Sequence, residues 1–449
     1  ALLGAIVWFL AQTGGNIELN TVLGLAILCL SALPALQWAK KRRAWFPAFE
    51  IGLLTYIAFY AIPLLNKHSE LENYPSGIIS YAALLVLLYL GAAIVGFNAV
   101  KSTMRAPTWA STTLLPPNAS RHLIKGVALN TLYIYLYNFT HLIPDEFSSL
   151  LRALFFGIGT ISTFVLARLW GQGRLSRPVI TLTVLNLVAQ FIMMFAQLYL
   201  IGGASLFTLV VISYSSAKRR IPWLALGLMI PLLAILHLGK PGMRIKYWGD
   251  APARPTITQL PSYYAEWFSY SMQARQAAQN SGDTKASLSE RASLLQMLCL
   301  SVDRVPTLRP HLGGESYIDL PAQIIPRILW PEKPSSLLAN VRLALYFNLV
   351  SLEDALKVSI AFGVIAEAYV NFGVPGVIVL GLLFGAGFKR AALLSQNASQ
   401  FSVLGILMIL LTAWSFQIEF ILATWLTSLF QAAVVCIGIP LVYRKFTSG

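Results

Sequence analysis

Residues 239–357 concentrate side chains that could bind or transfer a charged group. Thirteen lysines and arginines and ten acids lie there, more than half of all the acids in the chain. The arginines, together with one lysine of interest, are Arg244, Arg254, Arg275, Arg291, Arg304, Arg309, Arg327, Arg342 and Lys333. A guanidinium group donates two parallel hydrogen bonds to phosphate oxygens and keeps its charge, so the set suits a diphosphate.

Three of these arginines, Arg254, Arg309 and Arg342, are adequately explained as solvated loop charges. Arg244 is different because it follows an apolar run by a few residues, where it could anchor a helix at the lipid headgroups or bind a lipid diphosphate. Arg291 falls on the apolar face of an expected helix, and a charge there needs a partner. We therefore predict that Arg291 is functional.

Arg152 stands apart from this stretch, near the end of the apolar run at 150–170. An ionisable residue inside a span suggests function, although a position close to the interface also allows the side chain to reach water. Both interpretations of Arg152 stay open.

His311 is the only histidine within 239–357 and is followed by Gly313, Gly314 and Glu315. Imidazole can act as a base near neutral pH, and the glycines permit a tight turn beside a ligand. A solvated turn histidine is the alternative. The neighbouring arginines and Glu315 make a role in chemistry equally plausible.

Glu367 is a carboxylate in an apolar stretch, and Asn371 lies one helical turn later on the same face. Gly373, Pro375 and Gly376 should then break the helix. A broken helix at membrane depth is tolerated only where protein or a cavity surrounds it. We therefore prefer a site residue to a carboxylate that merely starts a helix.

The composition shows what kind of chain carries these residues. Hydrophobic types make up 57% of the 449 residues, charged types make up 11%, and the mean hydropathy is +0.67. Soluble domains are about a quarter charged, so the chain is expected to be an all-α polytopic membrane protein. Its three cysteines indicate no disulfide framework.

Apolar runs predict about twelve transmembrane helices, with both termini cytoplasmic. The first run is too short to span, and we expect the sequence to begin inside that helix. The predicted spans cover residues 1–12, 21–38, 48–65, 77–100, 123–142, 150–170, 179–199, 203–217, 221–238, 374–388, 402–417 and 421–442.

The net charge of +15 is very unevenly distributed between the loops. Eighteen lysines and arginines lie on one set of loops with a single acid, Glu50. Cytoplasmic loops carry such an excess, so the charge sets the orientation and does not indicate nucleic-acid binding. The long loop then faces the outside.

The expected organisation has three parts: spans one to nine at 1–238, an exterior loop at 239–357, and a broken helix with the last three spans at 358–449. Inside the loop we expect helices over 262–279 and from Ser287, where Ser287 and Glu290 form a capping-box pattern. Leu295, Leu298 and Val302 form an apolar stripe at helical spacing in the second of these helices. The segment 305–334 should instead be extended and turn-rich, because it contains six prolines: Pro306, Pro310, Pro321, Pro326, Pro331 and Pro334.

Several chemistries lack their sequence signatures. The chain has no Asp-x-Asp, His-x-x-x-His or paired cysteines for a metal, and no P-loop or dinucleotide-binding turn. No Gly-x-Ser-x-Gly nucleophile elbow is present. We therefore expect no metal, no cofactor, and neither ATP-driven nor hydrolytic chemistry.

The run 325–334 reads Ile-Pro-Arg-Ile-Leu-Trp-Pro-Glu-Lys-Pro. Together with Gly-Glu-Ser-Tyr at 314–317 and Glu-Ala-Tyr-Val-Asn-Phe-Gly at 367–373, it resembles the Wzy-type polymerases of bacterial O-antigen and exopolysaccharide repeat units. The matching motifs cover about residues 287–376. The remainder is similar only in layout, with many spans and one large late exterior loop.

This resemblance implies a GT-C-like, metal-independent glycosyltransferase of the bacterial inner membrane. Its donor and acceptor would be oligosaccharide repeat units linked to undecaprenyl diphosphate, and it would work beside a flippase and a chain-length regulator. The site would face the periplasm. An O-antigen ligase would use the same donor site, and a flippase for the same lipid-linked glycan is a further alternative.

Without a metal motif, cationic side chains must neutralise the diphosphate. We expect Arg244, Arg291 and Arg327 to hold its oxygens. Arg304 and Lys333 would support them. These groups should converge on one cleft.

One base is needed to deprotonate the acceptor hydroxyl, and His311 and Glu367 are the two candidates. Aromatic faces suit pyranose rings, and amides suit hydroxyl groups. Tyr317, Trp330 and Asn371 are therefore expected to contact sugar.

Overall fold

A computed structural model describes most of the chain, and it is helical. Its regular secondary structure consists of helices, and the one β-bridge among the described residues is an isolated antiparallel pair, Thr113 and Ser402. The predicted all-α fold is confirmed for this part of the chain. The described residues are 18–41, 46–66, 68–101, 106–114, 120–140, 142–143, 145–248, 255–280, 293–325, 330, 332–335, 337–356, 359–396 and 398–442.

The helices form two compact units, each assembled from separate stretches of sequence. Unit 1 comprises Ala1–Pro107, Ser289–Ala398 and Trp414–Gln431. Unit 2 comprises Thr108–Leu288, Ser399–Ala413 and Ala432–Gly449. The predicted division at residues 238 and 357 concerns topology relative to a membrane and stays a prediction.

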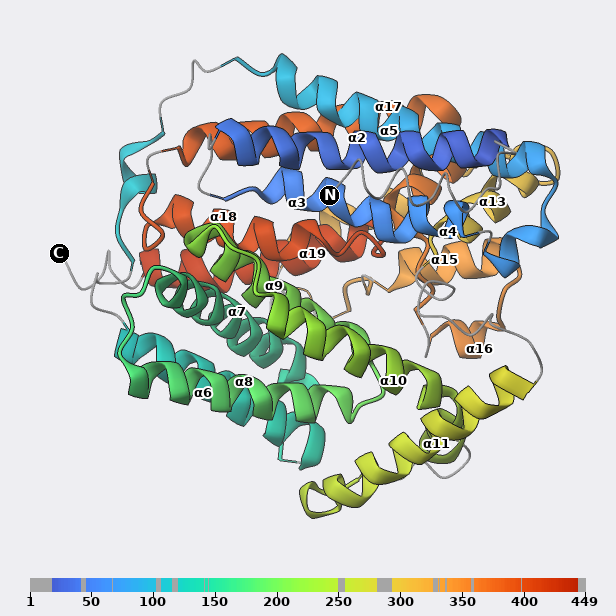
Figure 1. The fold of residues 1–449 in the computed structure, drawn as a ribbon. Coiled ribbons are helices and arrows are strands. Elements are labelled where there is room, and N and C mark those ends of the chain that lie inside the picture. The colour runs from blue at the N-terminus through green and yellow to red at the C-terminus, as the bar shows by residue number, and fades with distance from the viewer. Residues whose placement is uncertain are drawn as a thin grey trace. The chain divides into compact units, whose positions relative to one another are not determined.

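Unit 1 is built around the contact between its two longest helices, α5 and α17, which lie side by side (Figure 1). Small residues let the backbones approach, since a Cβ at Gly381 would lie 2.6 Å from the Tyr89 carbonyl oxygen. The elements of this unit are α2 (Leu19–Lys41), α3 (Ala48–Tyr56), η1 (Ile57–Ala61), α4 (Ile62–Leu65), η2 (Ser69–Asn73), α5 (Ser76–Ala99), α13 (Leu295–Arg304), η5 (Glu315–Tyr317), α14 (Leu320–Ile324), α15 (Leu338–Tyr346), α16 (Leu352–Ala355), α17 (Gly363–Leu394) and most of α19 (Leu422–Ala433).

Helix α17 is interrupted at Gly373, as the sequence predicts. Gly373 has φ 63° and ψ −150°, a conformation that strongly favours glycine. Pro375 then lies in the first turn after the break, where its missing N–H costs little. The residues Gly363–Phe372 therefore form a separate half-helix, which we call the upper half of α17.

Unit 2 contains a helical hairpin of α10 and α11, which the buried Trp267 holds together. Its Nε1 donates to the Leu236 carbonyl at 2.7 Å. The helix predicted over 262–279 is confirmed by α11. The elements of this unit are η3 (Thr108–Ser111), α6 (Ser120–Phe139), α7 (Asp145–Gly171), α8 (Arg177–Phe195), α9 (Leu200–Lys218), α10 (Trp223–Trp248), η4 (Ile257–Gln259), α11 (Leu260–Asn280), most of α18 (Val403–Ser415) and η6 (Val434–Gly438).

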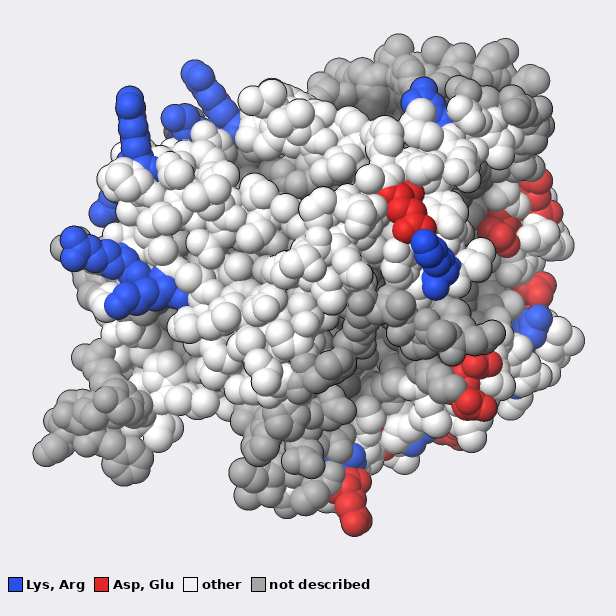
Figure 2. Space-filling view, turned by 90° about the horizontal axis from the view of Figure 1, so that it is seen from below, with Lys and Arg blue, Asp and Glu red and all other residues white. Residues whose placement is uncertain are grey.

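Nine helical stretches among the described residues are long and apolar enough to cross a membrane. Of the twelve predicted spans, residues 1–12 lie outside the described part. The predicted span 123–142 corresponds to α6, which is not among the nine. The predicted span 402–417 corresponds to α18, which has only 13 residues and is a shorter apolar helix. The face drawn in Figure 2 has a broad area without lysine, arginine, aspartate or glutamate, as contact with lipid requires. The chain is a multi-pass membrane protein.

The long loop has more helical structure than its prolines suggest. The predicted apolar stripe is confirmed, because Leu295, Leu298 and Val302 of α13 are all buried. Residues 287–292 lie outside the described part. Within 305–334, expected to be extended, the short helix α14 forms with Pro321 in its first turn, a position that tolerates proline.

The contact between α5 and α17 gives the first testable prediction. A Cβ at Gly385 would overlap the Ala93 carbonyl oxygen, whereas a Cβ at Gly387 meets nothing within 4 Å. We expect Gly385→Ala to destabilise the protein by roughly 2 kcal/mol or more, because the helix backbones must separate. Gly387→Ala should be neutral or stabilising by up to about 1 kcal/mol. Thermal unfolding in detergent measures both, and equal melting temperatures would contradict the packing described.

Candidate functional site

The candidate site lies in unit 1, where a buried carboxylate ties the upper half of α17 to two other segments. The Glu367 side chain is 0% exposed. Its Oε1 accepts a hydrogen bond from the Ser316 hydroxyl at 3.0 Å, and its Oε2 accepts one from the Leu422 N–H at 2.7 Å. A buried carboxylate is costly unless donors surround it. Both oxygens of Glu367 have such donors.

Asn371 completes this arrangement one turn further along the helix. Its Nδ2 donates to the Ser316 hydroxyl at 2.7 Å and to the Glu367 carbonyl at 2.8 Å. Its Oδ1 accepts from the Gly314 N–H at 3.1 Å. We call Glu367, Ser316, Asn371 and the Leu422 N–H the carboxylate clamp. The clamp joins three segments that are distant in sequence.

The loop at residues 311–317 is thereby held against the upper half of α17. The Leu312 N–H donates to the Val370 carbonyl at 3.0 Å, and the Gly313 N–H donates to the Asn371 carbonyl at 3.1 Å. Gly313 and Gly314 have φ 57° and 103°, so the turn depends on glycine. These bonds use carbonyls that the break at Gly373 leaves without helical partners.

His311 lies directly on this break. A Cβ at Gly373 would lie 3.3 Å from both Cε1 and Nε2 of His311, and the histidine is exposed. Its Nδ1 is 3.3 Å from the Val370 carbonyl oxygen. A carbonyl can only accept, so this contact assigns the proton to Nδ1 and leaves Nε2 as an acceptor.

Next to His311, Tyr346 holds the preceding part of the loop. Its hydroxyl donates to the Pro310 carbonyl, and the guanidinium of Arg309 lies 5.2 Å from its ring centroid. Asn348, with its amide oxygen turned toward Arg309, accepts from Nη2 at 3.0 Å. Tyr346 and Asn348 therefore hold the guanidinium of Arg309, which lies two residues before His311 in the sequence.

Two further arginines bond to backbone in the same region. Arg304 Nη1 donates to the Phe347 carbonyl at 3.2 Å. Arg342 Nη1 donates to the Glu315 carbonyl at 3.1 Å and lies 2.6 Å from Asp319 Oδ2. Unit 1 therefore gathers Arg304, Arg309 and Arg342 around the 304–319 segment.

The other predicted residues of this unit have varied surroundings. Glu315 is exposed, and Trp330 is 41% exposed. Lys333 is buried, and its Nζ donates to the Ile325 carbonyl at 2.7 Å. Tyr317 stacks on Phe372 with a centroid separation of 6.1 Å, and burial raises the pKa of its phenol well above the usual value.

Arg244 lies in unit 2 and has partners there. Its Nη2 donates to the Leu198 carbonyl at 3.1 Å, and its guanidinium lies 4.1 Å from the Trp248 ring centroid. Arg291 and Arg327 lie outside the described residues. The predicted convergence of these three arginines on one cleft therefore stays a prediction.

Arg152, also in unit 2, contacts an aromatic side chain of α6. Its Nη2 donates to the Tyr137 hydroxyl at 2.5 Å, and its guanidinium lies 5.0 Å from that ring centroid. The tyrosine supplies a partner for the charge of Arg152. A role in binding substrate stays a prediction.

A second carboxyl lies near the start of the upper half of α17. The carbonyl of Glu419 accepts from the Gly363 N–H at 3.2 Å, and its Oε2 accepts no hydrogen bond from the described residues. Burial raises the pKa of the Glu419 carboxyl to about 7. This group therefore titrates near neutral pH.

Within the described part of the chain, no three His, Cys, Asp or Glu side chains could hold a metal together.

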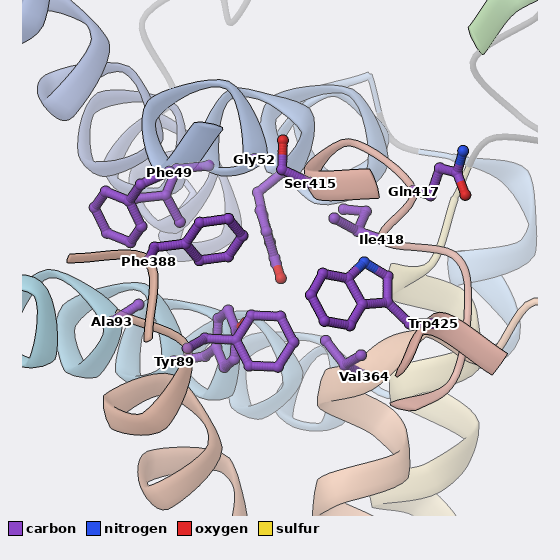
Figure 3. Close-up of a pocket in the computed structure, with 13 residues that line it drawn as sticks. Phe49, Gly52, Tyr89, Ala93, Val364, Phe388, Ser415, Gln417, Ile418 and Trp425 are labelled. Carbon is purple, nitrogen blue, oxygen red and sulfur yellow. The ribbon is translucent and has the colours of Figure 1, made fainter. Parts of the chain in front are cut away.

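An aromatic pocket adjoins the clamp within unit 1. Figure 3 shows the rings of Tyr89, Phe388 and Trp425 around an open space that Val364 and Ile418 also border. The Trp425 Nε1 donates to the Trp414 carbonyl at 2.9 Å, which leaves the indole face apolar. The lining is mainly aromatic and aliphatic and also includes Ser415 and Gln417.

Sequence reasoning missed several members of this site. Ser316 lies inside the Gly-Glu-Ser-Tyr motif, yet no periodicity connects it with Glu367, 51 residues away. The sequence predicts Arg309 to be a solvated loop charge. No sequence pattern marks Tyr346 or Phe372 as a site residue. The single available signal was the clustering of motifs at 309–317 and 367–373.

The chain belongs to the family described as a domain of unknown function (DUF8712), whose model matches residues 90–435. No curated protein and no solved structure matches the chain. The matched range contains the loop at 311–317, the broken helix and the whole carboxylate clamp.

The clamp predicts a measurable loss of stability. Ser316→Ala removes the donor to Glu367 Oε1 and the acceptor for Asn371 Nδ2, and it leaves both buried. We expect the free energy of unfolding to fall by about 2–3 kcal/mol. Ser335→Ala, at an exposed serine whose Oγ accepts from the Leu337 N–H, should change it by less than about 1 kcal/mol. Denaturant unfolding of the purified protein would refute the clamp if the two variants were equally stable.

Proposed function

We propose that this protein is a membrane glycosyltransferase that polymerises undecaprenyl-diphosphate-linked repeat units into a surface polysaccharide. The resemblance of residues 314–317, 325–334 and 367–373 to Wzy-type polymerases motivates the proposal. The observation that carries it is the placement of the exposed His311 on the break at Gly373, with its Nδ1 at the Val370 carbonyl and Arg309 two residues earlier in the same loop.

In the proposed reaction, a hydroxyl of the acceptor sugar attacks the anomeric carbon of the donor sugar. A glycosidic bond forms, and the bond between the anomeric carbon and the undecaprenyl diphosphate oxygen breaks. The hydroxyl proton passes to a base, and the lipid diphosphate leaves with the electron pair. Because the leaving group is good, catalysis requires mainly positioning and charge neutralisation.

We assign the base to His311 instead of Glu367. Both oxygens of Glu367 accept internal hydrogen bonds and the side chain is fully buried, so it cannot reach a substrate without breaking the clamp. His311 is exposed, and Nε2 can accept the proton while Nδ1 keeps its contact with Val370. Glu367 and Asn371 then position the loop and do not touch sugar.

The leaving diphosphate needs cationic partners. In unit 1 we assign this role to Arg309 and Arg304. Arg291 and Arg327, which the sequence predicts to hold the diphosphate oxygens, have the same role in the proposal. Arg244 belongs to unit 2 and is not included in this assignment.

The proposed membrane topology follows the charge of the loops. About twelve spans, both termini inside and the 239–357 loop outside place the site at the periplasmic face of the bacterial inner membrane. A GT-C-like arrangement and partnership with a flippase and a chain-length regulator belong to the same proposal.

Reconstitution tests the function directly. The purified protein in liposomes, supplied with lipid-linked repeat units from its native host, should produce a ladder of glycans that differ by one unit. The ladder should persist in EDTA, because no step requires a metal. A single transfer to lipid A core would instead indicate a ligase, and movement of labelled glycan without bond formation would indicate a flippase.

The base assignment predicts a specific loss in one variant. His311→Asn keeps a donor near the position of Nδ1 but removes Nε2, so chain growth should slow by about 10²–10⁴-fold at an unchanged melting temperature. His122→Asn, at an exposed histidine of α6, is the matched control and should leave the rate unchanged. Normal growth by His311→Asn would remove His311 from the mechanism.

A further inference from the structure

Phe372 is an exposed aromatic residue beside the proposed base. It is the last residue of the upper half of α17, directly before the break at Gly373 that His311 covers. Its side chain is 47% exposed, although its helical neighbours Asn371 and Gly373 are buried. Leaving about half of a phenyl ring uncovered forgoes stabilisation that burial would provide.

The loop at 311–317 fixes the orientation of this ring. A Cβ at Gly314 would lie 3.1 Å from Phe372 Cζ, so the absence of a side chain there makes room for the ring. Tyr317 stacks on Phe372 at 6.1 Å with an interplanar angle of 23°. With these neighbours in place, the Phe372 side chain is still 47% exposed.

The loop that adjoins Phe372 exposes polar groups, together with the apolar Ile318, which is 67% exposed. His311, Gly313 and Glu315 of the adjoining loop are all exposed, and Arg342 binds the Glu315 carbonyl. Groups of this kind can hydrogen-bond to sugar hydroxyls, while an aromatic face accepts the C–H groups of a pyranose ring. The two kinds of contact lie side by side on the same loop and helix end.

We propose that Phe372, supported by Tyr317, is the stacking platform for a pyranose ring of the acceptor repeat unit. The platform places the acceptor hydroxyl next to His311. This inference rests on the proposed function and names the acceptor subsite within it. It replaces the expected sugar contact of Asn371, which is 1% exposed and fully engaged in the clamp.

The competing explanation is that Phe372 faces lipid, as we expect of the exposed Val379 and Leu383 further along α17. Lipid contact requires an apolar side chain and not an aromatic one, so leucine would serve equally well. Stacking on a sugar requires a flat ring. Phe372→Leu and Phe372→Trp therefore separate the two roles.

The test measures binding separately from turnover. The full-length protein in nanodiscs is titrated with the repeat-unit oligosaccharide released from its lipid by mild acid, and the dissociation constant is obtained by calorimetry. Phe372→Leu should weaken binding roughly three- to tenfold, and Phe372→Trp should restore it to within about twofold. Leu383→Ala, at a 64% exposed position of the same helix, should bind as the wild type does.

Polymerisation assays with the same variants distinguish the two proposals. In Phe372→Leu the KM for the acceptor should rise by the same factor, with kcat nearly unchanged. Equal affinity of wild type and Phe372→Leu, or no binding by the wild type, overturns the platform. If the wild type binds through Phe372 yet forms no glycan ladder, the polymerase proposal fails and the carbohydrate site stands.

Discussion

A buried carboxylate, Glu367, is the interaction on which the candidate site depends. Placing this charge in the protein interior costs several kcal/mol unless donors satisfy it. Ser316 and the Leu422 N–H provide those donors from segments 51 and 55 residues away in sequence. Satisfying the carboxylate therefore forces a loop, a half-helix and the start of α19 into one arrangement.

The geometry of the loop follows from that arrangement. Once Ser316 is bound to Glu367 and Asn371, the preceding residues reach the free carbonyls of Val370 and Asn371, and His311 covers the break at Gly373. Buried groups thus hold the exposed part of the loop in place. The proposed catalytic role of His311 requires such preorganisation.

Local patterns predicted the parts of this site but not their assembly. The helix break was readable because Gly373, Pro375 and Gly376 lie close together, and the buried stripe of α13 was readable from its helical spacing. Glu367 stood out as a carboxylate in an apolar stretch. Its bond to Ser316 was not predictable, because nothing in the sequence specifies which distant donor satisfies a buried acceptor.

The same limit applies to the arginines and the spans. Sequence proximity to apolar runs selected Arg244, whereas tertiary contacts hold Arg309 against Tyr346 and Asn348. Hydropathy predicted the long helices well. It could not fix the roles of α6, which begins with charged residues, and of α18, whose 13 residues are few for a span.

The most direct measurement is a cryo-EM structure of the protein in nanodiscs with undecaprenyl diphosphate bound. The account predicts density for the two phosphates against the guanidinium of Arg309, within reach of the exposed face of His311. Diphosphate density remote from the loop at 304–317, with His311 facing only protein or lipid, would contradict it.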